Sequence, residues 1–179
     1  MNKIYCHELD FQFDDTLRES LLKKAKENTF KVHESILSSQ KTNYEVCSTY
    51  DNQLTVSDEM IEAREIITKL MCVPVTMNFI RLKPNTDMAP HIDAHHTKHR
   101  NCVLLTLLSP QGYPNETRLE FYNEEKQVVH THRYTKKSLL ATTDTLHNAF
   151  NDTQHDRYSF QMSFTQSIKE LLEMYDSRR

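Results

Sequence analysis

Two histidines and one aspartate in this sequence are placed so that they could bind a single transition-metal ion. His91 and Asp93 are separated by one residue, and His147 follows further along the chain. On an extended strand, side chains two residues apart point to the same face, so His91 and Asp93 could reach one ion together. Two imidazoles and a carboxylate can occupy one face of an octahedral ferrous ion and leave three positions open.

An arginine and a serine after His147 could bind a co-substrate. Arg157 and Ser159 come ten and twelve residues after that histidine. They lie in a stretch where polar and apolar residues alternate: Arg157, Ser159, Gln161 and Ser163 against Tyr158, Phe160, Met162 and Phe164. In a barrel with an internal site, the polar face of such a strand points inward and the apolar face packs beneath helices. A guanidinium fork and a hydroxyl on the inner face would suit a carboxylate.

The sequence contains ten histidines, so other residues compete with His147 for the third ligand position. His155 is a competitor, but it lies two residues before Arg157 and would crowd that residue. Three more, His95, His96 and His99, follow the HxD pair closely and are expected to line the entrance of the site.

His130 and His132 form an HxH pair that a cupin-like metal site would use. The glutamate expected a few residues later in such a motif is missing, and so are its glycines. The pair is therefore a second choice for the metal ligands.

Composition limits the classes of protein that need to be considered. The chain of 179 residues, 37% hydrophobic and 26% charged, is typical of one globular domain. No apolar run is long enough to span a membrane, and the first residues lack a signal peptide, so a cytoplasmic location is expected.

The four cysteines form no CxxC pair, and we expect reduced thiols. A net charge of −3 gives no indication of nucleic-acid binding, and a single glycine excludes glycine-rich phosphate loops.

Periodicity predicts a mainly β fold with flanking helices. Capping boxes at Thr16–Glu19 and Ser167–Glu170 predict helices to about residues 28 and 175, and a third helix is expected over 57–71. Strands are expected over 75–82, 102–108, 117–122, 127–134, 138–141 and 157–165. Residues 1–74 would form a helical N-terminal support, 75–166 the β core and 167–179 a C-terminal helix, all within one domain. The loops 40–55, 94–100 and 110–116 would frame the entrance of the site.

These motifs together resemble the Fe(II)- and 2-oxoglutarate-dependent dioxygenases, whose core is a double-stranded β-helix (a jelly roll, cupin-like in shape). The resemblance covers roughly residues 75–166, and the small prolyl and aspartyl/asparaginyl hydroxylases are closest in size and layout. Residues 78–85 resemble the strand and turn before the family's HxD, which His91 and Asp93 match. His147 matches the distal histidine, and Arg157 with Ser159 matches the 2-oxoglutarate anchor and its RxS pattern.

One departure from the family is the absence of glycines in two turns that precede the metal ligands. Asn85 and Asp144 occupy those turns instead. Both residue types tolerate left-handed backbone conformations, so the departure is physically acceptable.

The resemblance implies that Fe(II) is bound by His91, Asp93 and His147, with 2-oxoglutarate and O₂ at the open positions. Oxidative decarboxylation to succinate and CO₂ would accompany hydroxylation of a C–H bond, and the Asp93 carboxylate favours hydroxylation over halogenation. Arg100 opens the apolar strand just after the HxD loop, where it could contact the co-substrate or the substrate or be a solvated charge. A peptide, an amino acid and a small metabolite all remain open as substrates, and the oligomeric state is not indicated.

Two other functions stay open at this point. One is a jelly-roll binding module without catalytic activity, which would have no need for a carboxylate anchor after a metal ligand. The other is a cupin-type metalloenzyme that uses His130 and His132 and does not depend on 2-oxoglutarate.

Overall fold

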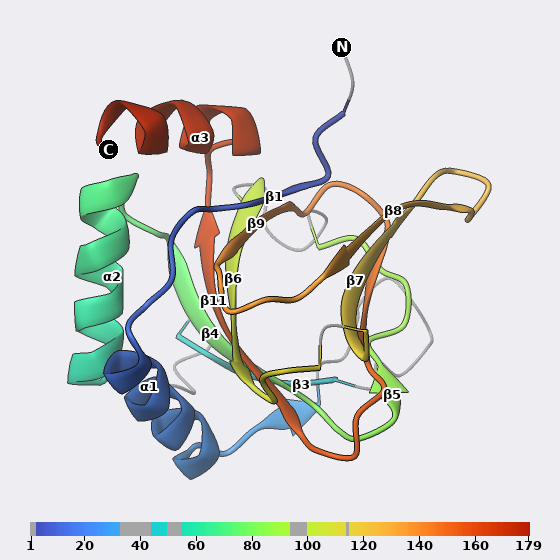
Figure 1. Ribbon diagram of the computed structural model, residues 1–179, viewed down its shortest axis with the longest axis horizontal. Helices are drawn as coiled ribbons and strands as arrows, with labels where there is room; N and C mark the ends of the chain where they lie inside the picture. Colours follow the sequence, from blue (N-terminus) through green and yellow to red (C-terminus); the bar gives the residue numbers. More distant parts are fainter. Residues whose placement is uncertain (1–2, 33–43, 50–54, 94–99, 114) are drawn as a thin grey trace.

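The computed structural model describes residues 3–32, 44–49, 55–93, 100–113 and 115–179, and these form two antiparallel β-sheets with three helices (Figure 1). The larger sheet has the order β1-β9-β6-β11-β4-β3-β2. Its strands are β1 (Cys6–Glu8), β2 (Lys31–Val32), β3 (Tyr44–Ser48), β4 (Thr76–Leu82), β6 (Cys102–Ser109), β9 (Leu139–Thr142) and β11 (Arg157–Phe164). The smaller sheet, with the order β5-β10-β7-β8, contains β5 (Thr86–Asp87), β7 (Thr117–Tyr122), β8 (Val128–Arg133) and β10 (His147–Asn151).

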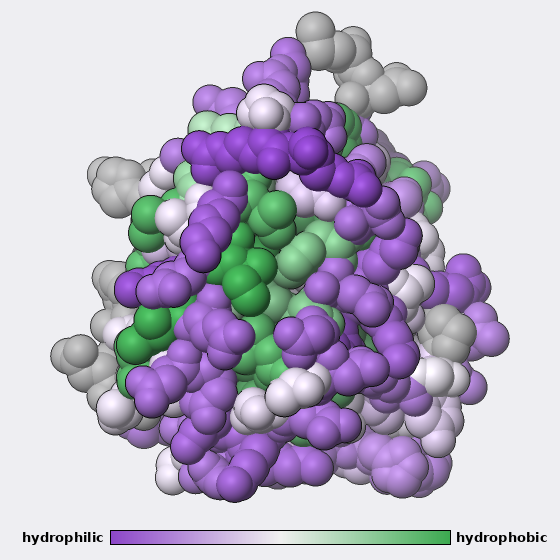
Figure 2. All heavy atoms as spheres, turned by 60° about the vertical axis from the view of Figure 1, so that its left-hand side comes forward, coloured by the Kyte–Doolittle hydropathy of each residue, from purple (hydrophilic) through white to green (hydrophobic). Residues whose placement is uncertain are grey.

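Two apolar layers hold the sheets and helices together. One layer lies between the two sheets and includes Ile80, Val103, Leu119 and Phe121. The other lies between the larger sheet and the helices α1 (Asp15–Glu27), α2 (Asp58–Leu70) and α3 (Ile168–Ser177). The helices cover one side of the larger sheet, and apolar side chains gather among hydrophilic ones on that face of the molecule (Figures 1 and 2). The predicted mainly β jelly roll with flanking helices is confirmed.

The alternation along β11 produces these two layers as the sequence predicted. Tyr158, Phe160, Met162 and Phe164 all belong to the layer beneath the helices. The opposite face of β11, which carries Arg157 and Ser159, therefore points toward the space between the sheets. The polar face of this strand is buried because it lines the interior of the jelly roll.

The helix boundaries agree with the prediction except at one cap. At α3 the predicted capping box is present, since Ser167 accepts from the Glu170 N–H and the Glu170 carboxylate accepts from the Ser167 N–H. At α1 the predicted box at Thr16 is wrong, because the cap is Asp14, whose carboxylate accepts from the Leu17 N–H at 2.8 Å. The helix therefore starts two residues earlier than expected. No helix in the described part of the chain is both long and apolar enough to cross a membrane.

The segment before residue 75 contributes more than helices. It also supplies β1, β2 and β3 to the larger sheet, where β3 pairs with β4 and β1 pairs with β9. These strands have three, two and five residues, too few for a clear alternating pattern. Their extended conformation comes from pairing with longer neighbours.

Three turns without glycine are stabilised in different ways. Asn85 adopts the expected left-handed conformation, with φ of 52°. Asp144 has no positive φ, and its carboxylate instead accepts from the Thr142 and Thr145 hydroxyls. Ala89 precedes Pro90, a position that favours an extended backbone, yet its φ is 63°. Asp87 stabilises this conformation by accepting the Ala89 N–H at 2.6 Å.

A buried asparagine ties the turn after β10 to the end of β4. The Asn151 amide donates to the carbonyls of Leu82, Lys83 and His155 at 2.8–3.1 Å, and its side-chain oxygen accepts from the Thr153 hydroxyl. We expect Asn151→Ala to lower the free energy of unfolding by about 2 kcal/mol or more, because buried carbonyls lose their donor. Urea denaturation measures this change, and Asn123→Ala in an exposed turn is the control. Equal stability of the two variants would contradict the assigned role.

Candidate metal centre

His91, Asp93 and His147 come together at one place between the sheets. His91 Nε2 lies 3.4 Å from Asp93 Oδ1, and His147 Nε2 lies 3.9 Å from Asp93 Oδ2. One ligand atom from each of the three residues lies within 4.8 Å of the other two. Among the described residues, this is the one group of three metal-binding side chains with that spacing.

Backbone pairing fixes the two histidines relative to each other. His147 begins β10, and its N–H and carbonyl exchange hydrogen bonds of 3.0 and 2.9 Å with the carbonyl and N–H of His91. His91 and Asp93 were expected to share a strand. Only His91 forms a β-bridge, and Asp93 lies in a bend. The two ring centroids lie 4.4 Å apart.

Both imidazoles are oriented by a carbonyl two residues earlier in the chain. His91 Nδ1 contacts the Ala89 carbonyl, and His147 Nδ1 contacts the Thr145 carbonyl, each at 2.8 Å. A carbonyl can only accept, so each Nδ1 carries a proton, and Nε2 is the ring atom of each histidine that faces Asp93. This is how metal-binding histidines are commonly oriented. The unusual φ of Ala89 thus directs its carbonyl toward the ring of His91.

The electrostatics of the centre prepare His147 and Asp93 for a metal ion. Burial acts to lower the pKa of His91, but its contact with Asp93 raises that pKa. Burial and the nearby His91 together lower the pKa of His147 to about 4, so this imidazole is neutral at neutral pH. Burial acts to raise the pKa of Asp93, but the Arg100 guanidinium and the two imidazoles hold it well below the ordinary value. A neutral imidazole and an ionised carboxylate are the protonation states that bind a metal.

Aromatic side chains from distant parts of the chain form the walls of the centre. The Tyr44 ring from β3 stacks on the His91 ring, with centroids 5.7 Å apart. The Phe121 ring from β7 lies 6.0 Å from the His147 ring. Both side chains are buried, so they exclude water from two sides of the ligands. The sequence analysis missed both residues.

Arg157 and Ser159 are buried on the inner face of β11. Arg157 Nη1 donates to the Phe150 carbonyl at 3.1 Å, and its guanidinium lies over the Tyr134 ring, 4.3 Å from the centroid. Its Nε is buried without a hydrogen-bond partner among the described residues. Tyr134 was not predicted, and its ring packs against the guanidinium.

Four further polar or charged side chains near the sheets differ in their distance from the metal ligands. Asn78 points inward and donates to Gln161 at 3.1 Å. Arg81 pairs with Glu45, and Tyr122 donates to Glu120 at 2.8 Å, so both are engaged away from the metal ligands. Arg100 lies at the centre itself, with Nη2 3.1 Å from Asp93 Oδ2.

The competing histidines have other partners. His130 Nε2 lies 3.2 Å from Cys6 Sγ, and His132 Nε2 lies 3.9 Å from a Glu8 carboxylate oxygen. The His155 ring packs against Tyr113. The expected positions of His95, His96 and His99 at the entrance, with most of the loops 40–55 and 94–100, lie outside the described residues.

Replacing His130 and His132 together by alanine tests the cupin-type alternative. We expect Fe(II) affinity to stay unchanged, because neither residue belongs to the group formed by His91, Asp93 and His147. His147→Ala, the matched control, is expected to abolish Fe(II) binding. Anaerobic Fe(II) titration measures both. If the double variant lost Fe(II) binding and His147→Ala retained it, the metal would bind at His130 and His132 instead.

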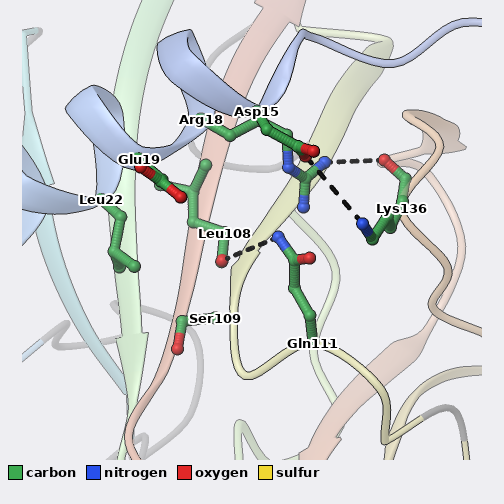
Figure 3. A pocket seen from close by; sticks show the side chains of 8 residues that line it. All are labelled: Asp15, Arg18, Glu19, Leu22, Leu108, Ser109, Gln111 and Lys136. Carbon is green, nitrogen blue, oxygen red and sulfur yellow. Dashed lines mark hydrogen bonds and ion pairs between the residues drawn. The ribbon is translucent and has the colours of Figure 1, made fainter.

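A separate pocket lies between α1 and the loops at the far end of β6 (Figure 3). It is lined by Asp15, Arg18, Glu19, Leu22, Leu108, Ser109, Gln111 and Lys136. Arg18 donates to the Lys136 carbonyl at 2.7 Å and to the Leu107 carbonyl, and Lys136 pairs with Asp15. Both cationic side chains of this pocket therefore already have partners. No residue of the metal centre lines the pocket.

No family model matches the sequence, and none of the curated proteins matches it. Solved structures do resemble it. A Pseudomonas putida prolyl-4-hydroxylase has a TM-score of 0.67 at 9% identity, covering 90% of this chain and 92% of its own. A Trichoplax adhaerens prolyl hydroxylase, solved with a peptide fragment of hypoxia inducible factor, has a TM-score of 0.64 at 11% identity, covering 96% and 86%.

A third neighbour catalyses a different reaction. The non-heme α-ketoglutarate-dependent epimerase SnoN from nogalamycin biosynthesis has a TM-score of 0.61 at 13% identity, covering 85% of this chain and 74% of its own. At such low identities these likenesses establish the fold. The chain thus has the jelly-roll fold of the 2-oxoglutarate- and Fe(II)-dependent oxygenases, with a His-Asp-His group that could bind their metal.

Proposed function

We propose that this protein is an Fe(II)- and 2-oxoglutarate-dependent oxygenase that hydroxylates a C–H bond of a peptide, an amino acid or a small metabolite. The observation that carries the proposal is the His91–Asp93–His147 group in the same interior as a buried arginine whose Nε has no partner among the described residues. The triad alone fits several divalent metals. The arginine adds a site for a carboxylate, which points to the 2-oxo acid.

The donor set fits Fe(II). The ε-nitrogens of both histidines face Asp93, and the carboxylate oxygens face one imidazole each. With metal and co-substrate bound, the centre would supply oxidative decarboxylation of 2-oxoglutarate to succinate and CO₂, coupled to oxidation of the substrate. The protein's own contribution is to fix the ligands through backbone pairing and to exclude water with Tyr44 and Phe121.

Arg157 and Ser159 are assigned to the far carboxylate of 2-oxoglutarate. A buried guanidinium without a carboxylate partner is costly, so a dianionic ligand stabilises it. The Nε of Arg157, without a partner among the described residues, can donate to a carboxylate oxygen, and Ser159 lies on the same face of β11. Tyr134 acts as a positioning residue, because its ring packs against the guanidinium.

The substrate class, location and domain organisation complete the proposal. The neighbours include a peptide hydroxylase and an epimerase, so the fold by itself does not choose between a peptide and a small molecule. The four cysteines are free thiols, which fits a reducing cytoplasm. We assign residues 1–179 to a single domain because β1 and α3, from the two ends of the chain, pack on the same sheet.

Anaerobic addition of Fe(II) and then 2-oxoglutarate tests the proposal. We expect a weak visible charge-transfer band that needs both ligands, followed by succinate formation when air is admitted. A protein that binds Fe(II) without developing the band, and forms no succinate in air, would be a metal-binding jelly roll of another kind.

A further inference from the structure

Arg100 places a positive charge directly beside the metal ligands. Its Nη2 lies 3.1 Å from Asp93 Oδ2, and its side chain is 20% exposed. The Nε of Arg100 is buried and has no hydrogen-bond partner among the described residues. Part of this guanidinium is thus left without a partner even while the other part contacts Asp93.

The backbone around Arg100 is held firmly where β6 begins. The Arg100 carbonyl accepts from the Thr143 hydroxyl at 2.7 Å, and the Asn101 N–H donates to the Phe164 carbonyl at 2.9 Å. These contacts join the start of β6 to the turn before β10 and to the end of β11. The guanidinium therefore projects from a rigid base, as a recognition residue requires.

The charges of the loaded site leave Arg100 uncompensated. An Fe(II) ion, the Asp93 carboxylate, dianionic 2-oxoglutarate and the Arg157 guanidinium together carry no net charge. Once Asp93 binds the metal, its negative charge is shared with the ion and no longer neutralises Arg100 alone. A partly buried cation in this position needs another anion.

We infer that the substrate carries a carboxylate, which Arg100 binds close to the C–H bond that is oxidised. This inference rests on the proposed function and narrows its substrate to an acid. A carboxylate fits better than a phosphate, because its single negative charge equals the one uncompensated positive charge. The flat guanidinium edge also matches the spacing of carboxylate oxygens.

The experiment compares acids with their amides on the anaerobic Fe(II)·2-oxoglutarate complex. The probes are the N-acetylated amino acids with free carboxylates and the same set as primary amides, with binding measured by calorimetry. We expect at least one acid to bind about 30-fold more tightly than its amide, the factor typical of a lost charged hydrogen bond. In Arg100→Gln the acid and the amide should bind equally.

Two further variants separate the roles of charge and structure. Arg100→Lys should keep part of the acid preference, and Arg118→Gln, an arginine already paired with Glu120 and Asp152 on the outer face, should keep all of it. Amides that bind wild type as tightly as every acid would overturn the inference. So would an Arg100→Gln variant that loses 2-oxoglutarate affinity as strongly as Arg157→Gln, since Arg100 would then bind the co-substrate. Absence of the Fe(II)·2-oxoglutarate band in wild type would instead reject the proposed function.

Discussion

Asp93→Ala is expected to abolish Fe(II) binding and, with it, 2-oxoglutarate consumption. Asp93 is the one anionic member of the triad, and its two oxygens face His91, His147 and Arg100 at 3.1–3.9 Å. Loss of an outer partner of a metal ligand already costs about 10–100-fold in affinity, so loss of the ligand itself should cost more. Anaerobic Fe(II) titration and succinate formation in air measure the two effects.

Two control variants separate loss of the ligand from loss of the fold. Asp152→Ala removes a carboxylate that pairs with Arg118 on the outer face, and Fe(II) binding should be unchanged. Asp93→Asn keeps an oxygen that can accept from Arg100, so it should fold as wild type does and still bind Fe(II) poorly. Wild-type Fe(II) affinity in Asp93→Ala would show that the metal binds elsewhere in the chain.

The sequence located the long elements because their patterns are local. The alternation in β11 and the continuous apolar run of β6 follow directly from burial of one face or of both. The capping box of α3 involves neighbouring residues only, so it too could be read from the sequence.

The strands that the sequence did not reveal depend on distant partners. β10, with the sequence HNAFN, has no apolar alternation, and its place is set by pairing of His147 with Phe121 and of Asn151 with Thr117. β5 has two residues and pairs with the same strand. In such short segments the partner strand, not the local propensity, determines the conformation.

The same distinction applies to the candidate site. The ligand types and the spacing of His91, Asp93 and His147 could be recognised without knowing the fold, because metal chemistry restricts the choice. Tyr44 gave no usable signal, since it lies in a polar stretch. Tyr134 could have been found, because His130, His132 and Tyr134 alternate at the end of a strand that was predicted.

Arg157→Gln is expected to raise the KM for 2-oxoglutarate about a hundredfold or more while Fe(II) affinity stays unchanged. Truncating one partner of a buried charge pair costs about 2–5 kcal/mol, and this guanidinium is 2% exposed. The metal ligands belong to β10 and the HxD segment, whereas Arg157 belongs to β11, so the variant leaves their backbone pairing in place. Steady-state succinate formation gives the KM, and anaerobic titration gives the Fe(II) affinity.

Graded variants show whether the guanidinium itself binds the co-substrate. Arg157→Lys keeps the charge but loses the fork and the contact with the Tyr134 ring, so it should restore only part of the affinity. Ser159→Ala removes one hydroxyl and should raise the KM by about fivefold, the value of one hydrogen bond. Equal KM values for Arg157→Gln and wild type would place the 2-oxoglutarate carboxylate away from β11. A loss of Fe(II) affinity in Arg157→Gln would show instead that Arg157 supports the metal centre.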